Sequence, residues 1–299
     1  LASRYVALEK QLERSLSGSE LEAQKSQLEE IFERGKQNLT GGYIQRLGDA
    51  LCFSQEDRDH LETGFKGLIA GRIEVYRKVQ ENLTVNLSGK DQWLLNCDKY
   101  MASQLRQASD SISSSASAGG ITLNDLCWAG KIGADYQTFY SHVSHGRGGK
   151  EEIIAMDVAM AEMKVETLIQ RGVLSGHMEK LLSSSRQARQ QQLLDVSDQR
   201  REAWRATSLP TAGVVKDADR NRFQEVFGTV LDVFAQNGGD ALAAVRKGVD
   251  FILRTARDTG VQYHYEDYDS SWYEKDVGKW KSFLADLGSG AAFGMDIKA

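Results

Sequence analysis

Proline is almost absent from this chain of 299 residues, in which Pro210 is the only one. Proline breaks helix interiors because it removes a backbone donor and clashes with the preceding turn, so a chain nearly free of it can form long helices. Apolar residues recur at helical spacing over most of the chain, and no alternating apolar–polar run is long enough for a sheet. We therefore predict an all-α protein, an elongated bundle of about eight to ten helices.

Breaks in the helical pattern predict where the first helices begin and end. Residues 17–19 separate two amphipathic stretches that we expect to pair as a helical hairpin or a short coiled coil. Ser19 followed by Glu22 has the pattern of a capping box, in which a hydroxyl and a carboxylate satisfy the first free amides of a helix. Gly41 and Gly42 predict an interruption of the second stretch.

Two further capping patterns predict helix starts. Ser54 is followed by Asp57, and Thr122 by Asp125. Between them, a GxxxG stretch at 67–71 indicates close packing of two helices, because its charged flanks argue against a membrane.

A serine- and glycine-rich segment at residues 110–120 predicts a linker, because such residues cannot pack a core. It divides the chain into an N-terminal helical part, 1–115, and a C-terminal helical part, 121–299. A single continuous domain is the alternative.

The second half of the chain shows clear helices. Residues 151–171 place three methionines at core spacing, and 222–258 predicts a helical pair that turns at the sequence NGGD. Residues 176–206 predict one long polar helix, and residues 260–273 a short strand or an extended loop. We expect the arginines of the polar helix to lie on a solvated face: Arg186, Arg189, Arg200, Arg201 and Arg205.

Charge and cysteine content exclude several classes of protein. The net charge is −5, so no basic field exists for nucleic acid. Cys52, Cys97 and Cys127 lie far apart and lack the spacing of a metal site or a disulfide framework, which predicts buried thiols in a chain folded under reducing conditions. No apolar run is long enough to predict a stable membrane span.

An acidic, aromatic segment near the C-terminus is the predicted partner-binding site. Six carboxylates and one lysine lie between residues 258 and 276, so this segment accounts for the whole net charge of −5. Aromatic side chains are enriched at recognition surfaces because they bury a large area at little entropic cost; packing at the end of the bundle is the alternative. The candidate residues are Tyr263, Tyr265, Glu266, Asp267, Tyr268, Asp269, Trp272 and Tyr273.

The stretch SHVSHGRGGKEE, residues 141–152, is a second candidate. His142 and His145 could share a helix face and bind a metal with Glu151, while a helix beginning near Lys150 could hold an anion. The glycines loosen the frame that zinc requires, and the spacing is neither HExxH nor that of a phosphate loop. We predict a loop between helices, with no metal and no cofactor.

No family motif occurs in the sequence. Its proline-poor, Ser- and Gln-rich helical composition resembles that of secreted or secretion-associated bacterial proteins, which implies a role in virulence and folding in the bacterial cytoplasm before secretion. The leading hypothesis is a non-enzymatic protein that binds another protein. The rivals are a hydrolase or transferase that uses His142 or His145 with acidic residues, and a helical protein that inserts into membranes.

Replacing Tyr265, Tyr268 and Trp272 by Ala tests the acidic segment. If it is a docking surface, binding of a protein partner is lost while the far-ultraviolet circular dichroism spectrum is unchanged. Unfolding of the triple variant contradicts this prediction and assigns the segment to the core. Loss of activity on replacing His142 and His145 by Ala, with a fully functional triple variant, reverses the ranking of the two sites.

Overall fold

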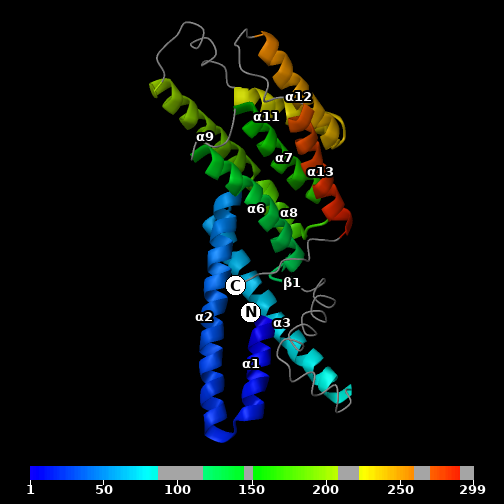
Figure 1. Ribbon diagram of the computed structural model, residues 1–299. Coiled ribbons are helices and arrows are strands. Elements are labelled where there is room, and N and C mark those ends of the chain that lie inside the picture. The colour runs from blue at the N-terminus through cyan, green and yellow to red at the C-terminus, as the bar shows by residue number, and fades with distance from the viewer. Residues whose placement is uncertain (87–116, 145–150, 208–221, 259–269, 290–299) are drawn as a thin grey trace.

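The computed structural model describes residues 1–86, 117–144, 151–207, 222–258 and 270–289 (Figure 1). These ranges are almost entirely helical, which confirms the predicted all-α fold. The helices are α1 (Ala2–Ser15), α2 (Gly18–Leu51), α3 (Gln55–Asn86), α6 (Leu123–Ser144), α7 (Glu151–Gln170), α8 (Gly176–Ser184), α9 (Arg186–Thr207), α11 (Arg222–Gln236), α12 (Ala241–Asp258) and α13 (Ser270–Ser289). The described strands are β1 (Ser117–Ala118) and β2 (Ile121–Thr122), which pair antiparallel.

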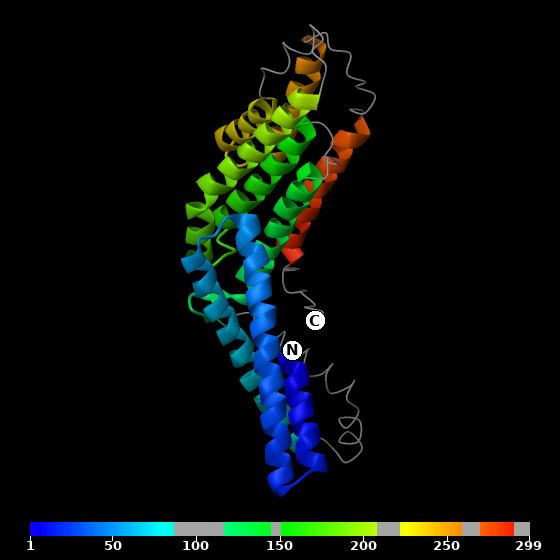
Figure 2. The same ribbon diagram turned by 90° about the vertical axis from the view of Figure 1, so that its left-hand side faces the viewer.

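The molecule is elongated and consists of an arm and a body (Figures 1 and 2). Helices α1, α2 and α3 form the arm, and α6 to α13 form the body. Helix α2 has 34 residues, which at 1.5 Å per residue gives a length of about 50 Å. One cluster of buried hydrophobic side chains extends through both parts. The predicted linker is wrong over residues 117–120, which form β1 and the turn after it and pack against α3. Residues 110–116 lie outside the described residues, and the division into two domains stays a prediction.

The predicted interruption at Gly41 and Gly42 is wrong, because α2 continues through both. Two glycines cost a helix about 2 kcal/mol. Tertiary packing on either side offsets this: Thr40 and Ile44 are fully or almost fully buried, so the helix is held where its own propensity is weakest. The capping box at Ser19 is also wrong, since α2 already begins at Gly18.

The two other predicted caps are confirmed. Ser54 Oγ accepts a hydrogen bond from the backbone N–H of Asp57 at 3.1 Å and donates one to its carboxylate at 2.6 Å. Thr122 Oγ1 accepts from the backbone N–H of Asp125 at 3.1 Å, while Asp125 Oδ2 accepts from the N–H of Thr122 at 2.6 Å. This reciprocal pair starts α6 directly after β2.

The glycines of α3 pack against the hairpin of β1 and β2, and not against another helix as the GxxxG pattern predicted. A Cβ atom at Gly64 would lie 2.7 Å from Ile121 Cδ1, and one at Gly67 would lie 2.9 Å from Ala118 Cβ. Gly71 has no such neighbour within 4 Å. The hairpin, whose Ile121 is fully buried, therefore joins the arm to the start of α6.

Helix α7 lies at the centre of the body, where it packs against α6, α11 and α12. Its methionines Met156, Met160 and Met163 are buried, as predicted. The predicted pair α11 and α12 is confirmed, and the turn between them places Gly238 and Gly239 at φ values of +62° and +88°, which glycine adopts without strain.

Two other predictions for the body are wrong in part. The expected single helix over 176–206 is divided, because α8 ends at Ser184 and α9 begins at Arg186. Residues 270–273 are helical and begin α13, although the sequence predicted a strand or loop there. Trp280 and Phe283 anchor α13, since both are buried and their rings lie 5.2 Å apart.

Among the described helices, none has both the length and the hydrophobicity needed to cross a bilayer.

Substituting Gly64 by Ala tests the contact between α3 and the hairpin. The added methyl group must displace Ile121 or the Ala118 carbonyl, so the free energy of unfolding should fall by about 1–3 kcal/mol in urea denaturation. Gly71→Ala is the matched control: its methyl group meets no atom within 4 Å, and it should raise the free energy by up to about 1 kcal/mol. Equal effects of the two substitutions contradict the packing described here.

Candidate functional site

The acidic aromatic segment falls almost entirely outside the described residues. This applies to Tyr263, Tyr265, Glu266, Asp267, Tyr268 and Asp269. Trp272 and Tyr273 belong to the first turn of α13, but the structure does not describe their side chains. The partner site predicted there stays a prediction.

The histidine stretch joins α6 to α7. His142 lies in the last turn of α6 and Glu151 is the first residue of α7, and neither side chain is among those described. His145 and Lys150 lie outside the described residues. The metal and anion alternatives at this stretch therefore stay predictions. Elsewhere, the described part of the chain contains no group of three or more His, Cys, Asp or Glu side chains placed to hold a metal ion.

A buried ion pair at the centre of the body is the strongest polar cluster that the sequence did not predict. Arg189 of α9 and Glu162 of α7 are both fully buried, and Arg189 Nε donates to Glu162 Oε1 at 3.0 Å. The prediction that Arg189 lies on a solvated face is wrong. The spacing in the sequence could have indicated that Arg189 is buried, because Arg189 lies four residues before the buried Leu193 and shares its helix face.

The cluster satisfies its own hydrogen bonds. Arg189 also donates to the carbonyl oxygen of Leu182 at 2.8 Å and to Ser185 Oγ at 2.5 Å, and the hydroxyl of Tyr136 donates to Glu162. Burial raises the pKa of Tyr136, and the adjacent Glu162 carboxylate raises it further. Burial alone lowers the pKa of Arg189, but Glu162 and Tyr136 outweigh burial and raise it. Both groups therefore keep their protons, which suits a structural role.

A second polar cluster lies where α2 reaches the body. The Cys52 thiol donates to Gln192 Oε1 at 2.6 Å, and the Tyr140 hydroxyl donates to the same oxygen at 2.9 Å. Burial raises the pKa of Cys52, so its thiol stays protonated near neutral pH and is a poor nucleophile. Burial also raises the pKa of Cys127 to about 11, which agrees with the buried thiol predicted there, whereas Cys97 lies outside the described residues.

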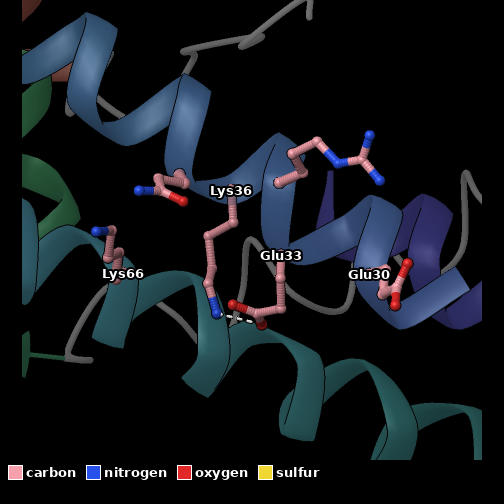
Figure 3. Close-up of a pocket in the computed structure, with 6 residues that line it drawn as sticks. Glu30, Glu33, Lys36 and Lys66 are labelled. Atoms are coloured by element: carbon pink, nitrogen blue, oxygen red, sulfur yellow. Dashed lines mark hydrogen bonds and ion pairs between the residues drawn. The ribbon is translucent and has the colours of Figure 1, made fainter. Parts of the chain in front are cut away.

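A charged groove of about 540 Å³ lies on the arm between α2 and α3 (Figure 3). It is lined by Glu30, Glu33, Arg34, Lys36, Gln37 and Lys66. Lys36 Nζ is 2.5 Å from Glu33 Oε1, and Lys66 Nζ is 2.5 Å from Glu62 Oε1. In Figure 3, Glu30 and Lys66 lie on opposite sides of the Glu33–Lys36 pair and do not point to a common centre. The groove therefore lacks the convergent groups of an active site.

An apolar surface lies along α1 and the neighbouring face of α2. In the part of the chain that the structure describes, the exposed large hydrophobic side chains are Leu1, Leu8 and Ile31, all on the arm. Ile31 is 64% exposed, whereas the adjacent Phe32 is buried against Tyr5 with ring centroids 4.5 Å apart. Phe32 therefore faces the core and Ile31 faces the surface.

The antiparallel register of α1 and α2 brings these side chains to one seam. Tyr5 meets Phe32, and Glu13 Oε1 pairs with Lys25 Nζ at 2.8 Å. Leu8, between Tyr5 and Glu13, therefore lies beside the turn of α2 that precedes Ile31. We call Leu1, Leu8, Ile31 and the half-buried Leu12 and Leu28 the arm seam.

We compared the chain with protein-family models, curated proteins and solved structures, and none matches it. Function is therefore inferred from the chain's own geometry, and the arm seam is the candidate site.

Replacing Arg189 by Met tests the structural role of the ion pair. The change leaves Glu162 buried with Tyr136 and with Arg186, whose Nε is 3.9 Å from Glu162 Oε2, and should lower the free energy of unfolding by about 3–5 kcal/mol. Adding Glu162→Leu removes the unpaired charge and should restore part of that loss.

The matched control is Lys10→Met in the pair between Lys10 and Glu13, which is partly exposed to solvent and should change the free energy by no more than about 0.5 kcal/mol. A loss from Arg189→Met as small as that of the control contradicts the structural role.

Proposed function

We propose that this protein is a non-enzymatic interaction protein whose arm seam binds a helix of another protein. One observation supports this most directly: the large apolar side chains that the described residues expose all lie on the arm. Scattered apolar residues are normal on a protein surface, but a contiguous apolar patch marks an interaction site.

The shape of the arm suits a helical partner. Two antiparallel helices leave a groove along their line of contact, and a third helix can pack its side-chain ridge into that groove. The partly buried leucines Leu12 and Leu28 extend the seam toward the turn between α1 and α2, so it offers several turns of apolar contact. In Figure 2 the turn between α1 and α2 lies at the end of the molecule that points away from the described helices of the body.

The charges beside the seam suit a partner with acidic side chains. Arg4 is exposed and lies one helical turn from Leu1 and from Leu8, and Arg34 is exposed one turn after Ile31. Such flanking charges increase the rate of association and set specificity more than affinity. A non-catalytic role of this kind suits a bacterial effector or a secretion-associated component, the classes that the composition resembles.

Replacing Leu8 and Ile31 by Glu tests the seam. Two apolar contacts are lost and two charges are placed opposite acidic partner residues, so affinity for the partner should fall at least about tenfold, the equivalent of 1.4 kcal/mol. Because Ile31 is 64% exposed and Leu8 39%, the free energy of unfolding should fall by no more than about 1 kcal/mol. The measurement is recovery of bound proteins from lysate, followed by titration calorimetry with the recovered partner.

The control variant carries Ala23→Glu and Gln37→Glu, which add the same two charges at exposed positions of α2 away from the seam. It should bind as the unmodified protein does. If the seam variant retains full affinity, or if both variants lose it equally, the seam is not the binding site.

A further inference from the structure

Two histidines face each other where the arm meets the body. The rings of His60 on α3 and His177 on α8 have centroids 4.5 Å apart and planes inclined by 40°. His60 Nε2 lies 2.8 Å from the carbonyl oxygen of Gly119, in the turn between β1 and β2. A Cβ atom added at Gly120 would lie 3.5 Å from the Cβ of His177. The pair thus connects α3, the hairpin and α8.

The surroundings of His177 disfavour a positive charge on its ring. Its Nε2 atom is buried and has no hydrogen-bond partner among the described residues. His177 is also the second residue of α8, and the free amides at a helix start place partial positive charge nearby.

Four ionisable groups face the ring: His60 and Asp57 from α3, Asp125 from α6 and Lys180 from α8. Burial lowers the pKa of His177 most, and His60 lowers it further, while the two carboxylates oppose this without reversing it.

A polar contact from α6 holds the same junction together. Asp125 accepts hydrogen bonds from the backbone N–H groups of Thr122 in the hairpin, at 2.6 Å, and of Ser175 before α8, at 2.7 Å. Asp125 is fully buried and each of its two carboxylate oxygens accepts one of these amides, which holds the carboxylate in place.

We propose that His60 and His177 form an acid-sensitive clasp between α3, the hairpin and α8. The clasp is closed when the His177 ring is neutral. When His177 is protonated, its charge has no partner beside the His60 ring, and the hairpin separates from α8 so that water can solvate it. The larger interface between α2 and α6 is unaffected, so the arm stays attached but is held on one side only.

The direction of the pH effect follows from proton linkage. The pKa of His177 in the closed clasp lies below the ordinary histidine value of about 6.5, so protons bind more tightly to the open form. The closed clasp is therefore fully favoured above about pH 6.5, and opening increases as the pH falls below that value, until the pKa of the closed form is passed.

Hydrogen–deuterium exchange of the full chain at pH 7.5 and pH 5.0 tests the clasp. Protection of the amides in residues 117–122 and 173–178, corrected for the intrinsic pH dependence of exchange, should decrease at pH 5.0. The decrease should be about tenfold for each unit by which the pKa of His177 lies below 6.5. Protection in α7 should stay constant. Equal protection of the junction at both pH values overturns the proposal.

Variants assign the effect to the two rings. His177→Gln should make protection of the junction independent of pH, whereas the triple control His142→Gln, His145→Gln and His264→Gln should retain the acid effect. An acid effect that persists in His177→Gln overturns the proposal.

If His177→Gln fails to fold, His60→Gln replaces it, because His60 is exposed and Gln can still donate to the Gly119 carbonyl. The pKa of His177 in proton magnetic resonance titrations should then rise, and an unchanged pKa contradicts the clasp.

Discussion

The fully buried pair of Glu162 and Arg189 fixes how α7 and α9 pack in the body. A carboxylate without solvent is tolerated only where cations and hydroxyl groups replace water, and α9 and α6 supply these through Arg189 and Tyr136. The three helices α6, α7 and α9 must therefore meet in one register. One turn further along α9, Gln192 accepts hydrogen bonds from Cys52 and Tyr140, so the end of α2 is attached to the same three helices.

The position of the arm is set by its contacts with these helices and with the hairpin. Helix α2 is fixed to α6 and α9 at one end, and α3 packs its glycines on the hairpin at Ile121. Beyond these contacts no described helix of the body lies beside α1, α2 and α3, and the outer positions of these three helices are only partly buried (Figure 1). The proposed binding seam is a consequence of this geometry, because α1 has 14 residues and cannot cover the full length of α2, which has 34. The histidine clasp would change how tightly the arm is held without altering the seam itself.

The sequence predicted what depends on local chemistry. The scarcity of proline and the spacing of apolar residues predicted helices, and the side chains of Ser54 and Thr122 predicted two of their starts, because a cap is formed by residues three apart. The sequence did not predict the features that depend on packing between distant segments. Gly41 and Gly42 lie within a continuous helix because buried neighbours hold them, and Arg189 is buried because Glu162, 27 residues away, meets it. The seam could not be predicted from the sequence either, because Ile31 and Phe32 are adjacent apolar residues and only the contact with Tyr5 shows that Phe32 is the buried one.

Site-specific photo-crosslinking tests the central claim, that the outer face of α1 and α2 binds another protein. A photoreactive phenylalanine derivative is placed at position 31 in one variant and at position 37, on the opposite flank of α2, in the other, and each is irradiated in the cells that make the protein. If this face binds a partner, position 31 gives a discrete crosslinked product with one other protein and position 37 gives none. Identical crosslinking patterns from the two positions, or crosslinking from neither, would contradict it.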